Sequence, residues 1–220
     1  MFDRLNILIG KEKLEKIKKS HVLLVGLGGV GSYVFEALVR SGIGKITIID
    51  YDTIDISNLN RQLITNIDNV GKYKVDEAIK RAKSINKDII VIKMSIKLDE
   101  NNIDKILNDK YDFIIDACDS VKAKIGLINY AKEYSIRIIC SMGTANKMHP
   151  ELLKISTLNK TKYDPLARIL RRQFKNDKIP VVYSEETPIK SNENVLGSIS
   201  FVPGTAGLLI ASYVINELIK

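Results

Sequence analysis

Apolar runs and amphipathic stretches alternate along the first 140 residues of this chain. The runs are nearly continuous, which is typical of strands that helices cover on both faces. We expect strands at about 21–25, 45–49, 88–93, 112–116 and 136–140. Helical spacing lies between them, at about 11–19, 30–40, 72–86, 101–108 and 121–134. Strands that alternate with helices predict an α/β fold, Rossmann-like and doubly wound, with a mostly parallel sheet.

The regular alternation of strands and helices ends after residue 150, where a C-terminal extension of mixed strands and helices begins. We expect strands at 152–157 and 179–183, with a helix between them that starts at Asp164 and Pro165. An aspartate followed by proline is typical of an N-cap and the first helical position. The apolar face of this helix is expected to hold Leu166, Ile169, Leu170 and Phe174. Residues 189–198 are polar and predict a mobile loop.

An apolar helix is expected from about Thr205 to Ile219. It is shorter than the ~20 apolar residues that span a bilayer, and Pro203 and Gly204 precede it. We therefore favour a buried core or dimer-interface helix over membrane contact. The whole chain, 1–220, is expected to be one domain, with a nucleotide-binding core at about 20–145 and a substrate-facing part at about 146–220.

Basic residues are concentrated in one short segment. The net charge of the chain is +8, and seven cations between Lys160 and Lys178 face only Asp164 and Asp177. Such a segment suits a polyanion such as RNA, although a solvated helix face would have the same charge. The candidates for RNA contact are Lys160, Arg168, Arg171 and Arg172.

The two cysteines lie in apolar runs. Cys118 and Cys140 are therefore expected to be buried thiols in a reducing compartment. Because the N-terminus shows no apolar signal region, we expect a cytoplasmic protein. His21 and His149 are the only histidines, so we do not expect a zinc ion held by protein ligands.

A glycine cluster follows the first predicted strand. Gly26, Gly28, Gly29 and Gly31 read as a tight turn that opens a helix, where backbone N–H groups and the helix dipole favour a phosphate. Asp50 ends the second strand, 19 residues after Gly31, near the spacing of a carboxylate that holds ribose hydroxyls. Asp52 fits the same site or a turn.

Two cations and a carboxylate follow later strands. Arg61 and Lys74 fit an enzyme that breaks a phosphoanhydride, because charge accumulates on the leaving pyrophosphate. Each could also be a surface residue at the start of a helix. Asp119 follows the fourth strand and could hold Mg²⁺ with triphosphate oxygens, or cap the next helix. Asn146 and Lys147, after the fifth strand, could meet a substrate carboxylate.

Five motifs in this order resemble the ubiquitin-activating-type (ThiF/MoeB-like) adenylating superfamily. They are Gly-Leu-Gly-Gly-Val-Gly, Asp50-Tyr-Asp, Ser57-Asn-Leu-Asn-Arg-Gln, Gly71-Lys-Tyr-Lys and Asp119-Ser-Val. The resemblance implies that ATP·Mg²⁺ is bound and a carboxylate is adenylated. It implies phosphate contacts for Asn58, Arg61, Gln62 and Lys74, ribose binding for Asp50, and a magnesium ligand in Asp119. Arg4 is similar to an arginine that members donate across a homodimer.

Later segments indicate the branch. Ser141-Met-Gly-Thr-Ala-Asn-Lys-Met-His-Pro, Lys160-Thr-Lys-Tyr-Asp-Pro-Leu-Ala-Arg, Val182-Tyr-Ser-Glu-Glu-Thr-Pro and Phe201-Val-Pro-Gly-Thr-Ala-Gly-Leu resemble the tRNA threonylcarbamoyladenosine dehydratase family. That family uses ATP to cyclise the threonylcarbamoyl group on the tRNA adenosine beside the anticodon. The modification carries its own attacking atom, so ring closure through an acyl-adenylate needs no enzyme nucleophile.

Three other functions remain possible from the sequence. The first alternative is activation of a ubiquitin-like sulfur-carrier protein, which would bring a sulfur-transfer-type partner. It is disfavoured because no cysteine follows Cys140 to act as nucleophile. A nicotinamide-dependent oxidoreductase would leave Arg61 and Lys74 without a role. A non-enzymatic RNA-binding scaffold that senses nucleotide would bind tRNA without releasing AMP.

Overall fold

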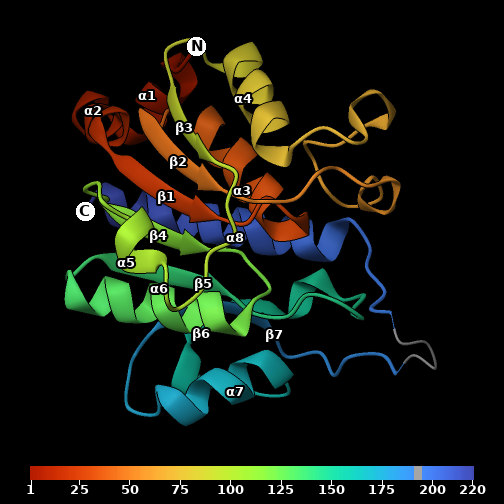
Figure 1. Ribbon diagram of the computed structural model, residues 1–220. Helices are drawn as coiled ribbons and strands as arrows, with labels where there is room; N and C mark the ends of the chain where they lie inside the picture. Colours follow the sequence, from red (N-terminus) through yellow and green to blue (C-terminus); the bar gives the residue numbers. More distant parts are fainter. Residues whose placement is uncertain (191–194) are drawn as a thin grey trace.

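A computed structural model describes residues 1–190 and 195–220, and its centre is a seven-stranded sheet (Figure 1). The strands are β1 (His21–Val25), β2 (Lys45–Ile49), β3 (Ile90–Met94), β4 (Phe113–Asp116), β5 (Arg137–Ser141), β6 (Leu153–Thr157) and β7 (Pro180–Ser184). Their order across the sheet is β3-β2-β1-β4-β5-β7-β6. Part of the predicted loop at 189–198 falls on 191–194 and lies outside the described residues.

The sheet is parallel except at one edge, which confirms the predicted doubly wound fold. β1 pairs in parallel with both β2 and β4, so the chain reverses its direction of travel across the sheet at this point. In open α/β sheets, ligands bind beyond the carboxyl ends of the strands at such a reversal. Among the strands of the described residues, β6 alone runs antiparallel, along β7. The predicted site residues therefore belong beyond the carboxyl ends of β1, β2 and β4.

Helices cover both faces of the sheet (Figure 1). The helices are α1 (Asp3–Ile9), α2 (Lys11–Lys19), α3 (Gly29–Arg40), α4 (Lys74–Ile85), α5 (Ile103–Ile106), α6 (Val121–Glu133), α7 (Pro165–Gln173) and α8 (Phe201–Leu218). One buried cluster joins α3, α4 and α8 to residues such as Leu24 and Ile48. A second joins α5, α6 and α7 to their strand neighbours Leu23 and Ile49. Neighbouring residues of one strand thus belong to different clusters, one on each face of the sheet. This agrees with the prediction from the apolar runs that helices cover both faces.

The apolar helix predicted near the C-terminus is a core helix. By length and composition α8 could cross a membrane, but 44% of its residues are buried inside the protein. Its glycines allow close contact with α3, since a β-carbon on Gly207 would lie 2.5 Å from the Val30 carbonyl oxygen. Its buried side chains Val202, Ile210 and Val214 belong to the first core cluster. The helix therefore supports the segment that carries the glycine turn.

Several elements differ from the expectation. The helix α1 was not predicted, because its seven residues include none that is buried. The helix expected at 101–108 is reduced to the four residues of α5. Short 3-10 helices follow β2, at Ile56–Asn58 and Ile67–Asn69. Leu170 of α7 and Phe174, directly after the helix, are buried, but Ile169 is 45% exposed and does not share their buried face.

Candidate functional site

The glycine turn joins β1 to α3 in close contact with the end of β4. Gly26 has a φ of 93°, and a β-carbon there would lie 2.6 Å from the Ala117 carbonyl oxygen. A β-carbon on Gly31 would lie 1.9 Å from the Gly26 carbonyl oxygen. Larger residues are excluded at both positions. Gly28 is the N-cap of α3 and Gly29 its first residue, so the helix N-terminus opens at the strand ends, where an anion is favoured.

Asp50 lies directly beyond β2 and contacts the same turn. Its Oδ2 accepts a 2.7 Å hydrogen bond from the Leu27 N–H, and its Oδ1 accepts one of 2.9 Å from the Asp52 N–H. The side chain is buried, and this burial raises the pKa of Asp50 above its usual value although Lys74 and the backbone donors lower it. The carboxylate is therefore fixed beside the glycine turn, where ribose hydroxyls could donate to it.

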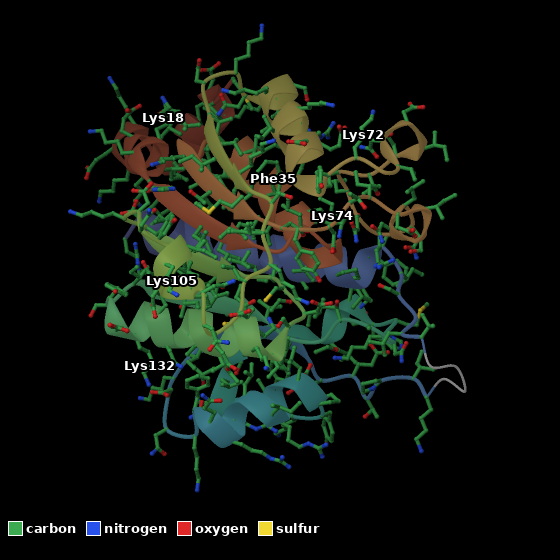
Figure 2. The ribbon with its side chains drawn as sticks, in the orientation of Figure 1. Lys18, Phe35, Lys72, Lys74, Lys105 and Lys132 are labelled. Atoms are coloured by element: carbon green, nitrogen blue, oxygen red, sulfur yellow. The ribbon has the colours of Figure 1, made fainter. Side chains whose placement is uncertain are left out.

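Lys74, at the start of α4, is buried and ion-paired with Asp52. Its Nζ lies 2.7 Å from Asp52 Oδ2, and its side chain is 5% exposed. In Figure 2 Lys74 lies near the middle of the fold, whereas Lys72 lies on an outer loop. The alternative interpretation of Lys74 as a solvent-facing helix residue is wrong. Asp52, for its part, is a charge partner for this lysine as well as a turn residue.

Three acidic residues surround the exposed ring of Tyr51. The charge of Asp52, followed by burial and the charges of Asp119 and Asp50, raises the pKa of Tyr51. These carboxylates come from the ends of β2 and β4, as the predicted crevice requires. Lys74 pairs with Asp52, and Lys97 Nζ lies 5.4 Å from the centroid of the Tyr51 ring, so charges of both signs meet at this edge of the crevice.

Arg61 lies over the start of α3. Its Nη1 donates to the Ser57 carbonyl oxygen at 2.7 Å and to Asn60 Oδ1 at 2.9 Å. Its Cδ lies 3.5 Å from the place that a β-carbon on Gly29 would take. The loop is tied to α3 by a 3.0 Å hydrogen bond from the Leu63 N–H to Ser32 Oγ. The guanidinium is therefore held at the edge of the glycine turn.

Asn58 and Gln62 shape this loop. Asn58 Oδ1 accepts from the Asp55 N–H at 3.1 Å and closes a capping box, while the Gln62 N–H donates to the Asn58 carbonyl oxygen. Gln62 is buried, and within the described ranges its Oε1 has no hydrogen-bond partner. Buried polar atoms are nearly always paired, and this oxygen can only accept, so its partner would be a donor such as a hydroxyl or water and not a phosphate oxygen. The phosphate contacts expected of both residues remain predictions.

Asp119 is exposed at the turn that follows β4. Ser120 caps α6, since its side chain accepts a hydrogen bond from the Ala123 N–H at 3.3 Å. Capping by Asp119 was therefore the wrong alternative. Within residues 1–190 and 195–220, no hydrogen bond or ion pair involves the Asp119 carboxylate. It is available to a ligand at the crevice.

The donor set at this turn suits magnesium better than a fully protein-bound metal. Among the described residues, no group of three or more His, Cys, Asp or Glu side chains could hold a metal. Mg²⁺ is usually bound by one or two carboxylates, with water and substrate phosphates completing its ligands. Asp119 fits that role, whereas Asp116 is already paired with Lys124.

The side chains of Lys147 and Asn146, in the loop after β5, already have partners within the protein. Lys147 Nζ donates to the Gly143 carbonyl oxygen at 2.7 Å and lies 3.6 Å from Asp164 Oδ2, with 1% of its side chain exposed. Burial lowers the pKa of Lys147, although Asp164 raises it. Asn146 Oδ1 accepts a 2.6 Å hydrogen bond from the Gly197 N–H. The substrate contact predicted for Lys147 would require this internal pairing to break.

The basic helix α7 begins as predicted, because Asp164 Oδ1 accepts from the Ala167 N–H at 2.8 Å. Arg168 and Arg172 are exposed, as is Lys160 just before the helix. Arg171 differs from them, since its Nη1 donates to the Thr161 carbonyl oxygen at 2.9 Å and also to the Thr161 hydroxyl. Arg171 therefore braces the helix, while the exposed cations form an outward-facing surface.

Arg4 lies far from the crevice of its own chain. It is exposed on α1, next to Phe2, whose ring lies 3.2 Å from the place of a β-carbon on Gly42. Gly42 follows the end of α3, and the glycine turn precedes its start. Twelve helical residues separate the two by about 18 Å. Arg4 therefore lies well away from the glycine turn of its own chain.

A buried ion pair at the end of β4 was missed from the sequence. Lys124 and Asp116 are both 0% exposed, and their Nζ and Oδ2 atoms lie 2.8 Å apart. Lysines are rarely buried, so Lys124 was not considered as a member of a buried pair. A signal was present, because Lys124 falls on the same helical face as the apolar residues Leu127, Ile128 and Ala131.

A doubly wound sheet, a glycine turn and crevice cations define a nucleotide-binding α/β protein. A model of the ThiF family matches residues 2–220, and the chain belongs to this family. It is 36% identical to the tRNA threonylcarbamoyladenosine dehydratase of Bacillus subtilis, over 100% of this chain and 94% of that protein. It is 34% identical to the Haemophilus influenzae protein of the same name, over 95% of this chain and 89% of that one.

A solved structure shows the same fold. The crystal structure of Escherichia coli tRNA N6-threonylcarbamoyladenosine dehydratase, TcdA, in complex with ATP superposes with a TM-score of 0.93. The two sequences are 31% identical, and the match covers 99% of this chain and 93% of that one. The resemblance inferred from sequence motifs is thereby confirmed.

Proposed function

We propose that this protein is an ATP-dependent enzyme that dehydrates, and thereby cyclises, the threonylcarbamoyl group on the tRNA adenosine beside the anticodon. The proposal rests on one observation: the chain matches a protein named for this reaction over its full length, at 36% identity. The crevice supports it with a nucleotide-binding turn beside Arg61, Lys74 and Asp119. Activation of a sulfur-carrier protein is less favoured, because no cysteine follows Cys140.

The chemistry fits the residues that the fold brings together. The threonyl carboxylate attacks the α-phosphorus of ATP, the bond to pyrophosphate breaks, and an acyl-adenylate forms. An atom of the same modification then attacks the acyl carbon and AMP leaves, so the tRNA loses one water. Arg61 and Lys74 would stabilise the charge that develops on the leaving pyrophosphate. Asp50 would hold the ribose, while Asn58 and Gln62 would contact phosphates.

Asp119 is the residue that would hold Mg²⁺ at the crevice. A bound magnesium ion would neutralise phosphate charge and orient the phosphates. The exposed carboxylate, with no partner among the described residues, supports this assignment. Asp52 would supply negative charge nearby while it keeps Lys74 in place.

A groove beside the crevice is a candidate site for the modified nucleoside. It has a volume of about 440 Å³ and is lined by Asn146, Lys147, Met148, Ile189 and residues 195–199. Asn60 Nδ2 donates to the Ser198 carbonyl oxygen at 3.0 Å, so the groove is joined to the loop at 57–62 that carries Asn58, Arg61 and Gln62. RNA bases that are read by proteins are usually splayed into such apolar sites. Lys160, Arg168 and Arg172 would hold the tRNA phosphates outside.

A homodimer is part of the proposal, because the N-terminal helix has an exposed apolar surface. Ile7 is 83% exposed and Leu8 80% exposed on α1. A second copy would cover them and could place its Arg4 at this crevice. A sulfur-transfer-type protein is a further candidate partner. A cytoplasmic enzyme would meet both ATP and tRNA.

A mass-shift assay tests the proposed reaction. Purified protein is incubated with ATP, Mg²⁺ and tRNA that carries the threonylcarbamoyl group, and the nucleosides are analysed by mass spectrometry. We expect AMP and a modified nucleoside lighter by one water. AMP formation that requires a carrier protein with a C-terminal Gly-Gly, and does not occur with tRNA, would support the alternative function instead.

A further inference from the structure

One fully buried ion pair lies directly beneath the crevice, and the proposed reaction does not use it. Lys124 Nζ donates to Asp116 Oδ2 at 2.8 Å and to the Ser141 carbonyl oxygen at 2.8 Å. Lys124 thus joins α6 to the carboxyl ends of β4 and β5. Removing two charges from water is costly, and an apolar pair of similar size is often equally stable. Stability alone therefore explains the pair poorly.

The other oxygen of Asp116 holds the turn that follows β4. Its Oδ1 accepts from the Cys118 N–H at 3.2 Å and from the Cys118 thiol at 3.0 Å. The opposite side of this turn contacts the nucleotide-binding turn, because Ala117 leaves no room for a side chain on Gly26. Asp119 is the next residue after Cys118. The lysine, the aspartate and the turn thus form one connected chain of contacts that leads to the crevice.

We infer that Lys124 is a positioning residue for catalysis: through Asp116 it fixes the turn at 117–120, and with it the carboxylate of Asp119. The inference rests on the proposed role of Asp119 in holding Mg²⁺ with ATP. Lys124 also neutralises Asp116, which leaves Asp119 as the uncompensated acid of this turn. Both side chains are fully buried, so neither Lys124 nor Asp116 would touch the nucleotide.

Alkylation of Cys118 reports directly on the turn in the Lys124→Met variant. The Cys118 thiol is only partly exposed and donates to Asp116 Oδ1 at 3.0 Å, so its accessibility depends on the turn. If the turn stays in place, loss of Lys124 should leave the rate of reaction of this thiol with iodoacetamide close to that of the parent. If the turn is released, the thiol becomes accessible, and we expect at least fivefold faster alkylation. Cys140 is buried beside the same ion pair, so global unfolding is followed separately by circular dichroism.

A double variant separates positioning from stability. Lys124→Met alone leaves Asp116 as an unpaired buried charge and should lower the urea midpoint. The double change Lys124→Met with Asp116→Leu removes both charges, so we expect the urea midpoint of the parent. The turn at 117–120 nevertheless loses its hydrogen-bond acceptor, the Asp116 carboxylate. Binding of a non-hydrolysable ATP analogue is measured by calorimetry with and without Mg²⁺. We expect the Mg²⁺-dependent gain in affinity to fall at least tenfold, with metal-free affinity within twofold of the parent. A parental Mg²⁺ gain in this variant overturns the inference.

Three further variants keep the test decisive. Lys132→Met removes an exposed lysine of the same helix, paired at 2.8 Å with Asp177, and should change none of these readouts. If the double variant does not fold, Lys124→Arg keeps the charge but displaces the turn, and an unchanged Mg²⁺ gain there overturns the inference. Asp119→Ala tests the proposed function separately. If Asp119→Ala keeps the Mg²⁺-dependent gain in affinity, the proposed role of Asp119 is wrong. If Asp119→Ala loses this gain but the Lys124 variants keep it, only the inference about Lys124 is wrong.

Discussion

The two cations of the crevice already have polar partners before a nucleotide binds. Lys74 is paired with Asp52, and Arg61 is held by the Ser57 carbonyl oxygen and Asn60. These contacts keep long side chains in place and reduce the entropy that binding must remove. Asp119 is the exception, because no described residue pairs with its carboxylate. We therefore expect this residue to show the clearest difference between binding and chemistry.

The change Asp119→Ala should slow adenylation far more than it weakens ATP binding. If the carboxylate positions magnesium, we expect the rate of AMP formation on modified tRNA to fall at least ~100-fold. Metal-free affinity for an ATP analogue should stay within about threefold, since the side chain contacts the metal rather than the nucleotide.

Ser120→Ala is the matched control for this change. It removes the N-cap of α6 but keeps the carboxylate, so it measures what loosening this turn alone costs, about 1 kcal/mol of stability. Equal losses of rate and affinity in Asp119→Ala would contradict the magnesium assignment.

The residues of the crevice were easier to predict than their partners. Asp50, Arg61, Lys74 and Asp119 stand after strands or at helix starts, so the sequence alone indicated their positions. Their pairing depends on contacts between distant segments, which no local pattern encodes. Lys124 illustrates this limit, because lysines are generally exposed and its burial depends on Asp116 and the end of β5.

At the scale of single elements, α7 separates its arginines into two kinds. Arg171 is bound to Thr161 and supports the helix, whereas Arg168 and Arg172 are exposed. Charge counting along the sequence cannot make this distinction, because it depends on where the preceding segment folds back. The exposed pair is therefore the better test of RNA binding.

The double change Arg168→Gln and Arg172→Gln should weaken tRNA binding by about tenfold or more. Each arginine that contacts a phosphate releases counterions, so the slope of log affinity against log salt should flatten by about 1–2 units. ATP affinity should not change. Binding is measured by fluorescence anisotropy across a range of salt concentrations.

Lys11→Gln with Lys13→Gln is the control, because it removes the same charge from the exposed face of α2. We expect it to leave the salt slope unchanged. If the α7 variant also kept the parental slope, its arginines would form only a solvated face.

The contact between α3 and α4 should make stability depend on pH through Glu36. Its carboxylate accepts from Arg40 Nε at 2.7 Å and from Arg81 Nε at 3.0 Å. Burial acts to raise the pKa of Glu36, but Arg81 and Arg40 outweigh it and lower the pKa below 4.5. The ionised form therefore stabilises the fold above the unfolded-state pKa, and this contribution is lost as pH falls through the folded-state value.

Glu36→Gln should cost about 1–3 kcal/mol of unfolding free energy at pH 7. The difference from the parent should shrink below pH 4.5. Urea unfolding at several pH values measures it. Glu12→Gln, at an 87% exposed side chain, is expected to change stability by less than about 0.5 kcal/mol at any pH. If the difference in unfolding free energy between Glu36→Gln and the parent does not shrink as the pH is lowered, the loss comes from packing and not from charge.

At the scale of the whole molecule, the fold was largely predictable up to β5. Continuous apolar strands and helical spacing alternate there, and connection rules leave few topologies. The later part was less predictable, because β7 enters between β5 and β6 and only β6 runs antiparallel. The direction and place of a strand depend on partners that the local sequence does not show. α1 was missed because its apolar residues face outward.

Mixed dimers test whether Arg4 acts on a second copy. Arg4→Ala and Asp119→Ala are each expected to be inactive alone. In a hybrid dimer, one crevice would combine an intact Asp119 with the intact Arg4 of the other protomer. Equal mixing should therefore restore about a quarter of parental activity.

Hybrid formation is checked by native mass spectrometry. Activity that stays absent although hybrids form would exclude donation of Arg4 across a dimer. A purely monomeric protein would exclude the homodimer itself.

The packing of α8 on α3 has a consequence for protein synthesis. Pro203 lies beside Gly29, and Gly207 beside Val30, although more than 170 residues separate them along the chain. During synthesis, the glycine motif at 26–31 therefore leaves the ribosome long before α8, the helix that packs against α3. We expect ATP affinity to arise only after residues 201–218 have emerged, so unfinished chains would not sequester nucleotide.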